Sequence, residues 1–247
     1  MKLSIVIPAY NESKGLSETI IAFHIALVKA GIIHEMIVVN DNSSDNTVEI
    51  LENLKSTIPT LRYITNPPPR NGYGFAVRSG LESFTGDCVA IVMADLSDSP
   101  DDLVAFYQKM KNENLDCVFG SRFIKGGTLF GYPKSKYLIN RIANNIVKLV
   151  FAISYNDCTN AFKLYRRETI EGLKPFLSPH FNLTLELPLK AIVRGYSYAV
   201  VPNSWTNRKN SISNFRIREM GSRYFFILIY CLIEKYFSKG DFKKKWN

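Results

Sequence analysis

Short continuous apolar runs alternate with longer segments whose apolar residues recur at helical spacing over the first 200 residues. Continuous runs are typical of strands buried on both faces, and the helical spacing is typical of helices packed on a sheet. The alternation predicts an α/β fold with an open, mostly parallel, twisted sheet flanked by helices. We expect strands over 3–7, 35–39, 62–65, 86–93, 116–120, 157–165 and 198–201 and helices over 16–27, 48–55, 75–83, 134–152 and 183–194, with another starting near Pro100.

A second pattern begins near residue 205. The chain carries a net charge of +9, and residues 205–247 contain 10 Lys and Arg against 3 Asp and Glu. These charges flank an apolar run over 224–233, which is shorter than the roughly 20 residues that a membrane span needs. We therefore divide the chain into a catalytic domain (1–213) and a basic amphipathic helical tail (214–247). The tail fits the surface of an anionic membrane or a contact between copies of the chain, and no nucleic-acid partner is expected.

Several function classes lack their motifs. The four cysteines and three histidines show no metal-ligand or disulfide spacing, which favours a reducing, cytoplasmic compartment and disfavours zinc. No glycine fingerprint of dinucleotide-binding folds follows the first predicted strand. The phosphate loop of ATPases and the nucleophile elbow of hydrolases are also missing from the sequence.

Polar residues gather where three predicted strands end, over 8–12, 40–47 and 95–98. Ligands of open α/β sheets bind at the carboxyl ends of the strands, so a nucleotide is expected to lie across these loops. Asp41 is a candidate acceptor for hydrogen bonds from ribose or base, while Pro8 and Tyr10 are candidates to flank a base ring. Gly72 lets the backbone approach a ligand closely, although a turn alone also uses glycine.

The central apolar run over 90–94 ends in Asp95 and Asp98. Carboxylates at this position suit a hard divalent cation that keeps open positions for phosphate oxygens. The alternative is structural: Asp98 or Asp101 caps the helix that starts near Pro100.

Five segments together resemble the family 2 glycosyltransferases, and in particular dolichol-phosphate mannose synthases and related polyprenyl-phosphate glycosyltransferases. They read PAYNE over 8–12, VVNDNSSDNT over 38–47, MADLSD over 93–98, GSRFIKGG over 120–127 and DCTNAFK over 157–163. The resemblance runs from residue 3 to about residue 215. It implies a GT-A-type fold, a GDP- or UDP-sugar donor, Mg²⁺ or Mn²⁺, and a polyprenyl phosphate acceptor.

The resemblance also implies roles for single residues. Asp95 would bind the metal with Ser97 as a secondary ligand, and Arg122 would contact phosphate rather than form a structural ion pair. The nucleoside would be held by Pro8, Tyr10, Glu12 and Asp41, and the acceptor or its phosphate by Ser135, Arg141 and Arg208. Two positions depart from the family pattern: Met93 stands where an acid is usual, and Asn40 replaces the usual first acid of its loop.

The implied reaction is an inverting sugar transfer at the cytoplasmic face of a membrane, by a peripheral enzyme of glycan biosynthesis. A lipid phosphate is already an anion, so catalysis reduces to positioning two phosphates and stabilising the leaving diphosphate. If the acceptor is a sugar hydroxyl instead, Asp98 is the candidate general base. Two alternatives stay open: a soluble glycosyltransferase acting on a saccharide, and a non-catalytic module that binds nucleotide-sugars.

Overall fold

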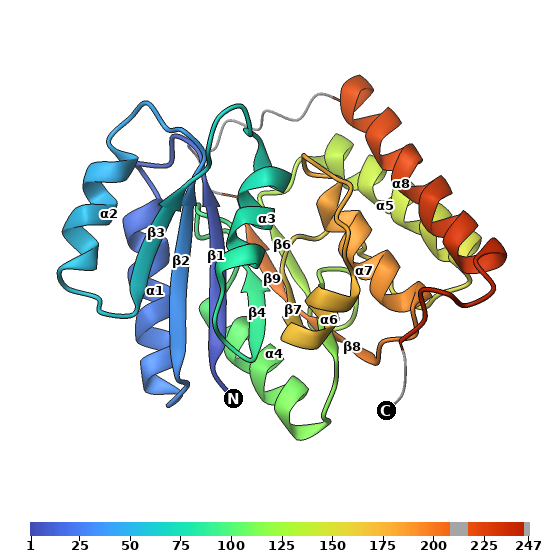
Figure 1. Cartoon of the computed structure of the whole chain (residues 1–247), viewed down its shortest axis with the longest axis horizontal. Helices are drawn as coiled ribbons and strands as arrows, with labels where there is room; N and C mark the ends of the chain where they lie inside the picture. Colours follow the sequence, from blue (N-terminus) through green and yellow to red (C-terminus); the bar gives the residue numbers. More distant parts are fainter. Residues whose placement is uncertain (208–216, 245–247) are drawn as a thin grey trace.

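The structure is a computed structural model that describes residues 1–207 and 217–244. A seven-stranded sheet lies between two layers of helices (Figure 1). The strands are β1 (Leu3–Ala9), β2 (His34–Asn40), β3 (Leu61–Thr65), β4 (Cys88–Ile91), β5 (Cys117–Ser121), β7 (Lys163–Arg166) and β8 (Tyr198–Pro202), with β6 (Thr128–Phe130) and β9 (Ser204–Thr206) in a separate ribbon. The helices are α1 (Leu16–Lys29), α2 (Thr47–Lys55), α3 (Tyr73–Ser83), α4 (Pro100–Asn112), α5 (Lys134–Phe151), α6 (Arg167–Gly172), α7 (Leu183–Val193) and α8 (Ile217–Phe237).

The sheet has the strand order β3-β2-β1-β4-β7-β5-β8. Every neighbouring pair is parallel except the two pairs that involve β7. The prediction of an open, mostly parallel sheet is therefore confirmed, with β3 at one edge and β4 in the centre. The strands between the two edges are buried on both faces, which explains their continuous apolar runs.

Alternate residues of each strand enter two different cores. Val6, Val89 and Phe119 face α3, α5, α7 and α8, whereas Ile5, Ala90 and Val118 face α1, α2 and α4. This is the period of two that a pleated strand imposes on its side chains. The helices therefore cover both faces of the sheet and leave the carboxyl ends of β1, β2 and β4 to the connecting loops.

The segment over 157–165 differs from its prediction. β7 begins only at Lys163 and runs antiparallel, while residues 157–162 are irregular with a turn at 158–159. The physical reason is that the side chains of this segment bind backbone groups elsewhere: Asn160 Nδ2 donates to the carbonyl of Gly120, and the Asp157 carboxylate accepts from the Arg122 N–H. The short elements β6, β9 and α6 were not predicted, and β4 ends at Ile91 rather than at residue 93.

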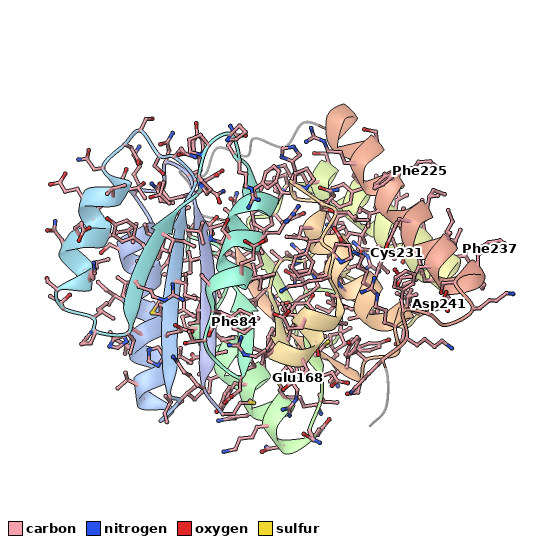
Figure 2. All side chains as sticks on the ribbon, in the orientation of Figure 1. Phe84, Glu168, Phe225, Cys231, Phe237 and Asp241 are labelled. Carbon is pink, nitrogen blue, oxygen red and sulfur yellow. The ribbon has the colours of Figure 1, made fainter. Side chains whose placement is uncertain are left out.

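The tail helix α8 packs on the domain. Ile227 and Cys231 are fully buried in the same core as α7, and Figure 2 shows Cys231 on the inner side of α8 with Phe225 and Phe237 on its outer side. Arg194, the C-cap residue of α7, donates to the carboxylate of Glu234 through Nε at 2.7 Å and Nη2 at 2.9 Å. Both side chains of this ion pair are buried, so α8 is fastened to the domain by charge as well as by apolar contact. The division at residues 213 and 214 stays a prediction.

Candidate active site at the carboxyl ends of three parallel strands

The loops after β1 and β2 are joined by hydrogen bonds. The Asn11 N–H donates to Ser43 Oγ at 3.0 Å, and the Ser13 N–H donates to Asp45 Oδ2 at 3.1 Å. Asp45 also accepts from the Thr47 N–H at the start of α2. Asp45 was not among the predicted site residues, although the loop over 40–47 that contains it was predicted to line the site. The two loops behave as one wall of the site, with Tyr10 54% exposed at its rim.

The loop after β4 rests on the first turn of α1. Thr19 Oγ1 donates to the Ala94 carbonyl at 2.8 Å, and a Cβ on Gly15 would lie 3.4 Å from the Cα of Asp95. The loop turns at Leu96, which has a positive φ of 52°, and the Ser97 N–H donates to Asp95 Oδ1 at 3.0 Å. These contacts place Asp95 beside the β1 loop, at the predicted edge of the sheet.

Two carboxylates, those of Glu12 and Asp98, each lie within the electrostatic range of Asp95. Burial together with the charges of Asp95 and Asp45 raises the pKa of Glu12 to about 7. Burial and the Asp95 charge likewise raise the pKa of Asp98 to about 7, although the Met93 N–H and Arg122 act against the rise. Among the described residues, neither Glu12 nor Asp98 has an ion-pair partner. Excess negative charge that is partly removed from water attracts a cation.

The protein oxygens in this loop suit a hard cation only if a bound ligand supplies further oxygens. Ser97 Oγ is buried and has no hydrogen-bond partner among the described residues, and Asp95 beside it is half-buried. Within residues 1–207 and 217–244, no three His, Cys, Asp or Glu side chains converge on a common metal position. The oxygens of Asp95 and Ser97 therefore fit a cation such as Mg²⁺ or Mn²⁺ that takes its remaining ligands from phosphates and water.

The capping alternative for Asp98 is wrong. The N-cap of α4 is Ser99, and no side chain makes a capping hydrogen bond there. Asp98 is instead buried, with Oδ2 3.4 Å from the Met93 nitrogen, and it forms an isolated antiparallel bridge with Trp205. In the first turn of α4, Asp102 Oδ2 accepts from the Ser204 N–H at 2.7 Å. The β9 segment thus covers the loop that carries Asp95 and Asp98.

Asp41 and Gly72, both predicted to bind nucleotide, contact each other. The Gly72 N–H donates to Asp41 Oδ2 at 2.6 Å, and Asn66 Nδ2 donates to Asp41 Oδ1 at 2.8 Å. Gly72 has a φ of 115°, and a Cβ there would lie 2.8 Å from the ring of His180. The close approach at Gly72 is therefore to the chain's own His180, and Asp41 positions the loop before α3.

The predicted residue Pro8, and Asn40, which departs from the family pattern, are both internal to the protein. Pro8 is buried in β1 opposite Val39, so its ring lies below the loop that carries Tyr10. Asn40 Oδ1 accepts from the Ser43 N–H at 3.0 Å, so the amide that replaces the usual acid shapes the β2 loop.

Arg122 corrects our expectation. Its Nε and Nη2 donate to the two carboxylate oxygens of Asp157 at 2.8 and 2.7 Å, and both side chains are buried. Burial alone would lower the pKa of the guanidinium, but Asp157 raises it. Arg122 does form a structural ion pair, because Asp157 is buried inside the domain within hydrogen-bond distance of it. The sequence contained Asp157 in a recognised segment, but nothing in the spacing paired it with Arg122.

The predicted acceptor residues lie on α5 or beyond the described part of the chain. Ser135 is exposed in the first turn of α5, and the guanidinium carbon of Arg141 lies 4.5 Å from the centre of the Phe123 ring. Arg208 lies outside the described residues. Ser135 and Arg141 therefore both lie on α5, and Arg141 contacts Phe123 of the loop after β5.

α5 and α8 expose apolar side chains on the outside of the molecule, and we call this surface the apolar outer face. Lys235 of α8 donates to the carbonyl of Phe151 at the end of α5 at 2.5 Å, which joins the two helices. The exposed side chains are Leu138, Ile142, Ile146 and Leu149 of α5 and Phe225, Phe226, Ile229, Ile233 and Phe237 of α8. No helix in the described part of the chain is long and apolar enough to span a membrane.

Known proteins agree with this architecture. The chain is 26% identical over 234 residues to polyprenol monophosphomannose synthase of Mycolicibacterium smegmatis, covering 89% of this chain and 86% of the relative. It is 30% identical over 193 residues to dolichol-phosphate mannosyltransferase of Pyrococcus furiosus, covering 77% of this chain and about half (53%) of that relative. Glucosyl-3-phosphoglycerate synthase from Mycobacterium tuberculosis, solved with Mn²⁺, UDP and phosphoglyceric acid, superposes with a TM-score of 0.69. That match covers 95% of this chain and 78% of the other at 20% identity, which confirms the GT-A fold.

The sequence pattern of glycosyl transferase family 2 matches residues 4–173. This range contains all three loops of the site and the Arg122–Asp157 pair. The chain is therefore a member of glycosyl transferase family 2.

Proposed function

We propose that this enzyme transfers a sugar, with inversion, from a GDP- or UDP-sugar to a polyprenyl phosphate at the cytoplasmic face of a membrane. The observation that carries the proposal is the position of the apolar outer face on α5, the helix that also carries Ser135 and Arg141. Two relatives whose names specify polyprenol or dolichol phosphate support the same acceptor class.

The donor binds at the loops that carry Glu12, Asp95 and Asp98. A divalent cation held by Asp95 and Ser97 would neutralise the diphosphate of the donor and the charge that develops on the leaving group. Tyr10, exposed at the rim, flanks the base, and the joined β1 and β2 loops form the wall against which the nucleoside lies. Glucosyl-3-phosphoglycerate synthase, which shares the fold and was solved with Mn²⁺ and UDP, supports a divalent cation and a nucleotide as the ligands.

The acceptor approaches from α5. A phosphate monoester anion attacks the anomeric carbon without first losing a proton, so the site needs cationic donors and no general base. Arg141, Ser135 and Arg208 are the proposed partners of the acceptor phosphate. Arg122 is a positioning residue and not a phosphate ligand, because its Nε and Nη2 donate to Asp157.

The membrane contact is proposed for the apolar outer face as a whole. Asn144, Val147 and Phe151 of α5 are buried against the domain, and the large apolar side chains of the apolar outer face are exposed on the same helix. An exposed apolar surface of this kind suits a lipid surface. Basic residues around the face, each worth about 1 kcal/mol near anionic lipid, add to the attachment. The competing occupant is a second copy of the chain.

One observation favours the saccharide alternative: Asp98 has the raised pKa, about 7, of a general base. Asp98→Asn separates the two reactions. With polyprenyl phosphate as acceptor the variant keeps its rate within about tenfold, because no proton is removed, whereas a sugar hydroxyl acceptor loses 10²–10⁴-fold.

The test is a donor screen with a short polyprenyl phosphate as acceptor. Wild-type enzyme, Mg²⁺ or Mn²⁺ and each of several GDP- and UDP-sugars are incubated together, and the lipid fraction is analysed for an added sugar. One donor is expected to support transfer, and Asp95→Asn is expected to abolish it. If every donor fails with the lipid while a saccharide acceptor is glycosylated, the soluble alternative is correct.

A further inference from the structure

Four aromatic side chains connect the catalytic loop to α5. The rings of Tyr132 and Trp205 meet edge to face with centroids 5.0 Å apart, and those of Phe123 and Tyr137 do the same at 5.7 Å. The guanidinium carbon of Arg122 lies between the two pairs, 5.4 Å from the centre of the Phe123 ring and 5.7 Å from that of Tyr132. We call these four aromatic residues the aromatic path.

The two ends of the aromatic path lie at different parts of the site. At one end Trp205 pairs with Asp98, and the neighbouring Thr206 N–H donates to the Ser97 carbonyl at 3.0 Å. At the other end Tyr137 is 45% exposed on α5, next to the exposed Leu138 of the apolar outer face. The path therefore runs from the carboxylate loop to the surface that we propose to face lipid.

The path is built on ordered backbone. β9 pairs in parallel with β6, with Leu129 opposite Trp205, and the Asn207 N–H donates to the Phe130 carbonyl at 2.9 Å. Tyr132 follows β6 after a single residue, Gly131, so this ribbon positions both aromatic residues nearest to Asp98. A surface fixed in this way loses little conformational freedom when a ligand binds.

The path is apolar along its length, although two arginines touch it. Phe123, Tyr132 and Trp205 are each partly exposed, so the rings keep surface for a ligand. The charge of Arg122 is balanced by Asp157, and Arg141 stacks on Phe123 with its guanidinium carbon 4.5 Å from the ring centre. Aromatic surface beside a cation fits a ligand that joins a hydrocarbon chain to an anion.

We propose that the isoprene units nearest the phosphate of the acceptor pack along the aromatic path, between Trp205 at the catalytic loop and Tyr137, which lies on α5 with the proposed phosphate partners Ser135 and Arg141. The proposal rests on the proposed function and adds the residues that contact the hydrocarbon chain of the lipid. A polyprenyl chain is the occupant because a ligand that begins at the catalytic loop and ends at the apolar outer face must be hydrocarbon at its far end. A donor sugar needs only the Trp205 end of the path.

The first test uses tryptophan fluorescence and needs no turnover. The chain has two tryptophans, so Trp246→Phe leaves Trp205 as the only reporter. Farnesyl phosphate is expected to shift the emission of Trp205 to shorter wavelength in a saturable way, and inorganic phosphate is expected to leave the emission unchanged. A response to nucleotide-sugar without any response to farnesyl phosphate would assign Trp205 to the donor sugar and overturn the proposal.

The second test compares the KM of acceptors with one, two and three isoprene units. In the wild-type enzyme each added unit is expected to lower the KM of the acceptor. In Tyr137→Ala and Trp205→Phe the KM of the longest acceptor is expected to rise at least tenfold, so that this gain is lost. The KM of the donor is expected to stay unchanged. Tyr63→Ala is the matched control, since Tyr63 is also partly exposed, lies beneath a cation, and is on the distant edge strand β3.

The two proposals fail in different ways. If the wild-type enzyme transfers sugar to all three acceptors but Tyr137→Ala and Trp205→Phe show the same dependence of the KM on chain length, the proposal of the aromatic path is wrong and the proposed function stands. If the wild-type enzyme glycosylates none of them and Trp205 does not respond to farnesyl phosphate, both are wrong.

Discussion

Arg122 and Asp157 form a buried two-point ion pair, and the same Asp157 Oδ2 also accepts from the Arg122 backbone N–H at 3.0 Å. The pair joins the end of β5 to the turn before β7. It therefore orders the segment from which the aromatic path and the acceptor side of the site begin.

We expect Asp157→Asn and Arg122→Gln each to lower the free energy of unfolding by about 3–5 kcal/mol, because each leaves the other side chain as a buried charge without its partner. Urea denaturation measures the loss, and the double variant should lose much less than the sum of the two. Strict additivity would show that the side chains act independently and would return Arg122 to its predicted role on phosphate.

Asp95→Asn should nearly abolish transfer while leaving the thermal midpoint of the free enzyme within a few degrees of wild type. The reason is that Asp95 is half-buried and has no ion-pair partner among the described residues, so its charge serves a ligand. Calorimetry should also show that Mn²⁺ binds weakly without nucleotide, because few protein oxygens are available. Tight binding of Mn²⁺ alone would contradict this account of the site.

Gly74→Ala should be strongly destabilising and should weaken nucleotide binding. An added Cβ would lie 2.5 Å from the carbonyl carbon of Pro179, so the loop before α3 would move away from the turn before α7. Gly221→Ala on α8 is the control, since nothing lies within 4 Å of its added Cβ, and it should be neutral or slightly stabilising. Equal stabilities of the two variants would show that the close approach at Gly74 is unimportant.

The sequence predicts the sheet and the carboxylate edge well because both depend on local patterns. Continuous apolar runs identify β1, β2 and β4, and polar residues at their ends identify Asp95 and the β1 and β2 loops. The Arg122–Asp157 pair, the contact of Gly72 with His180 and the approach of Trp205 to Asp98 join residues far apart in the chain. Such contacts depend on tertiary packing, which no local spacing encodes. The antiparallel direction of β7 was not predicted, for the same reason.

Glu35 should make the fold acid-sensitive. Burial alone would raise its pKa, but hydrogen bonds from Ser4 and Thr85 and the charge of Lys2 lower it to about 2. A carboxylate whose pKa is lower in the folded state contributes stability above its unfolded value, about 4.5, and loses it as the pH falls toward 2. Glu35→Gln should therefore flatten the fall in unfolding free energy between pH 4.5 and pH 2. An unchanged pH profile would place the acid sensitivity elsewhere.

The apolar outer face predicts binding to vesicles. Co-sedimentation with anionic vesicles should be strong for wild type and reduced at least tenfold in Ile142→Asp/Phe225→Asp, because both charges would enter the acyl boundary. High salt should weaken the wild-type binding through its basic residues. If neither protein sediments and the wild type is a stable oligomer without detergent, the face is a contact between copies of the chain.

The most direct measurement is the mass of the lipid product. Vesicles containing polyprenyl phosphate are incubated with the enzyme, the divalent cation and the donor found in the screen, and the extracted lipid is analysed by mass spectrometry. Our account predicts a polyprenyl phosphate that has gained one sugar residue, with the opposite anomeric configuration to the donor, and no such product with Asp95→Asn. Unmodified lipid, with the sugar released to water or attached to a saccharide, would contradict it.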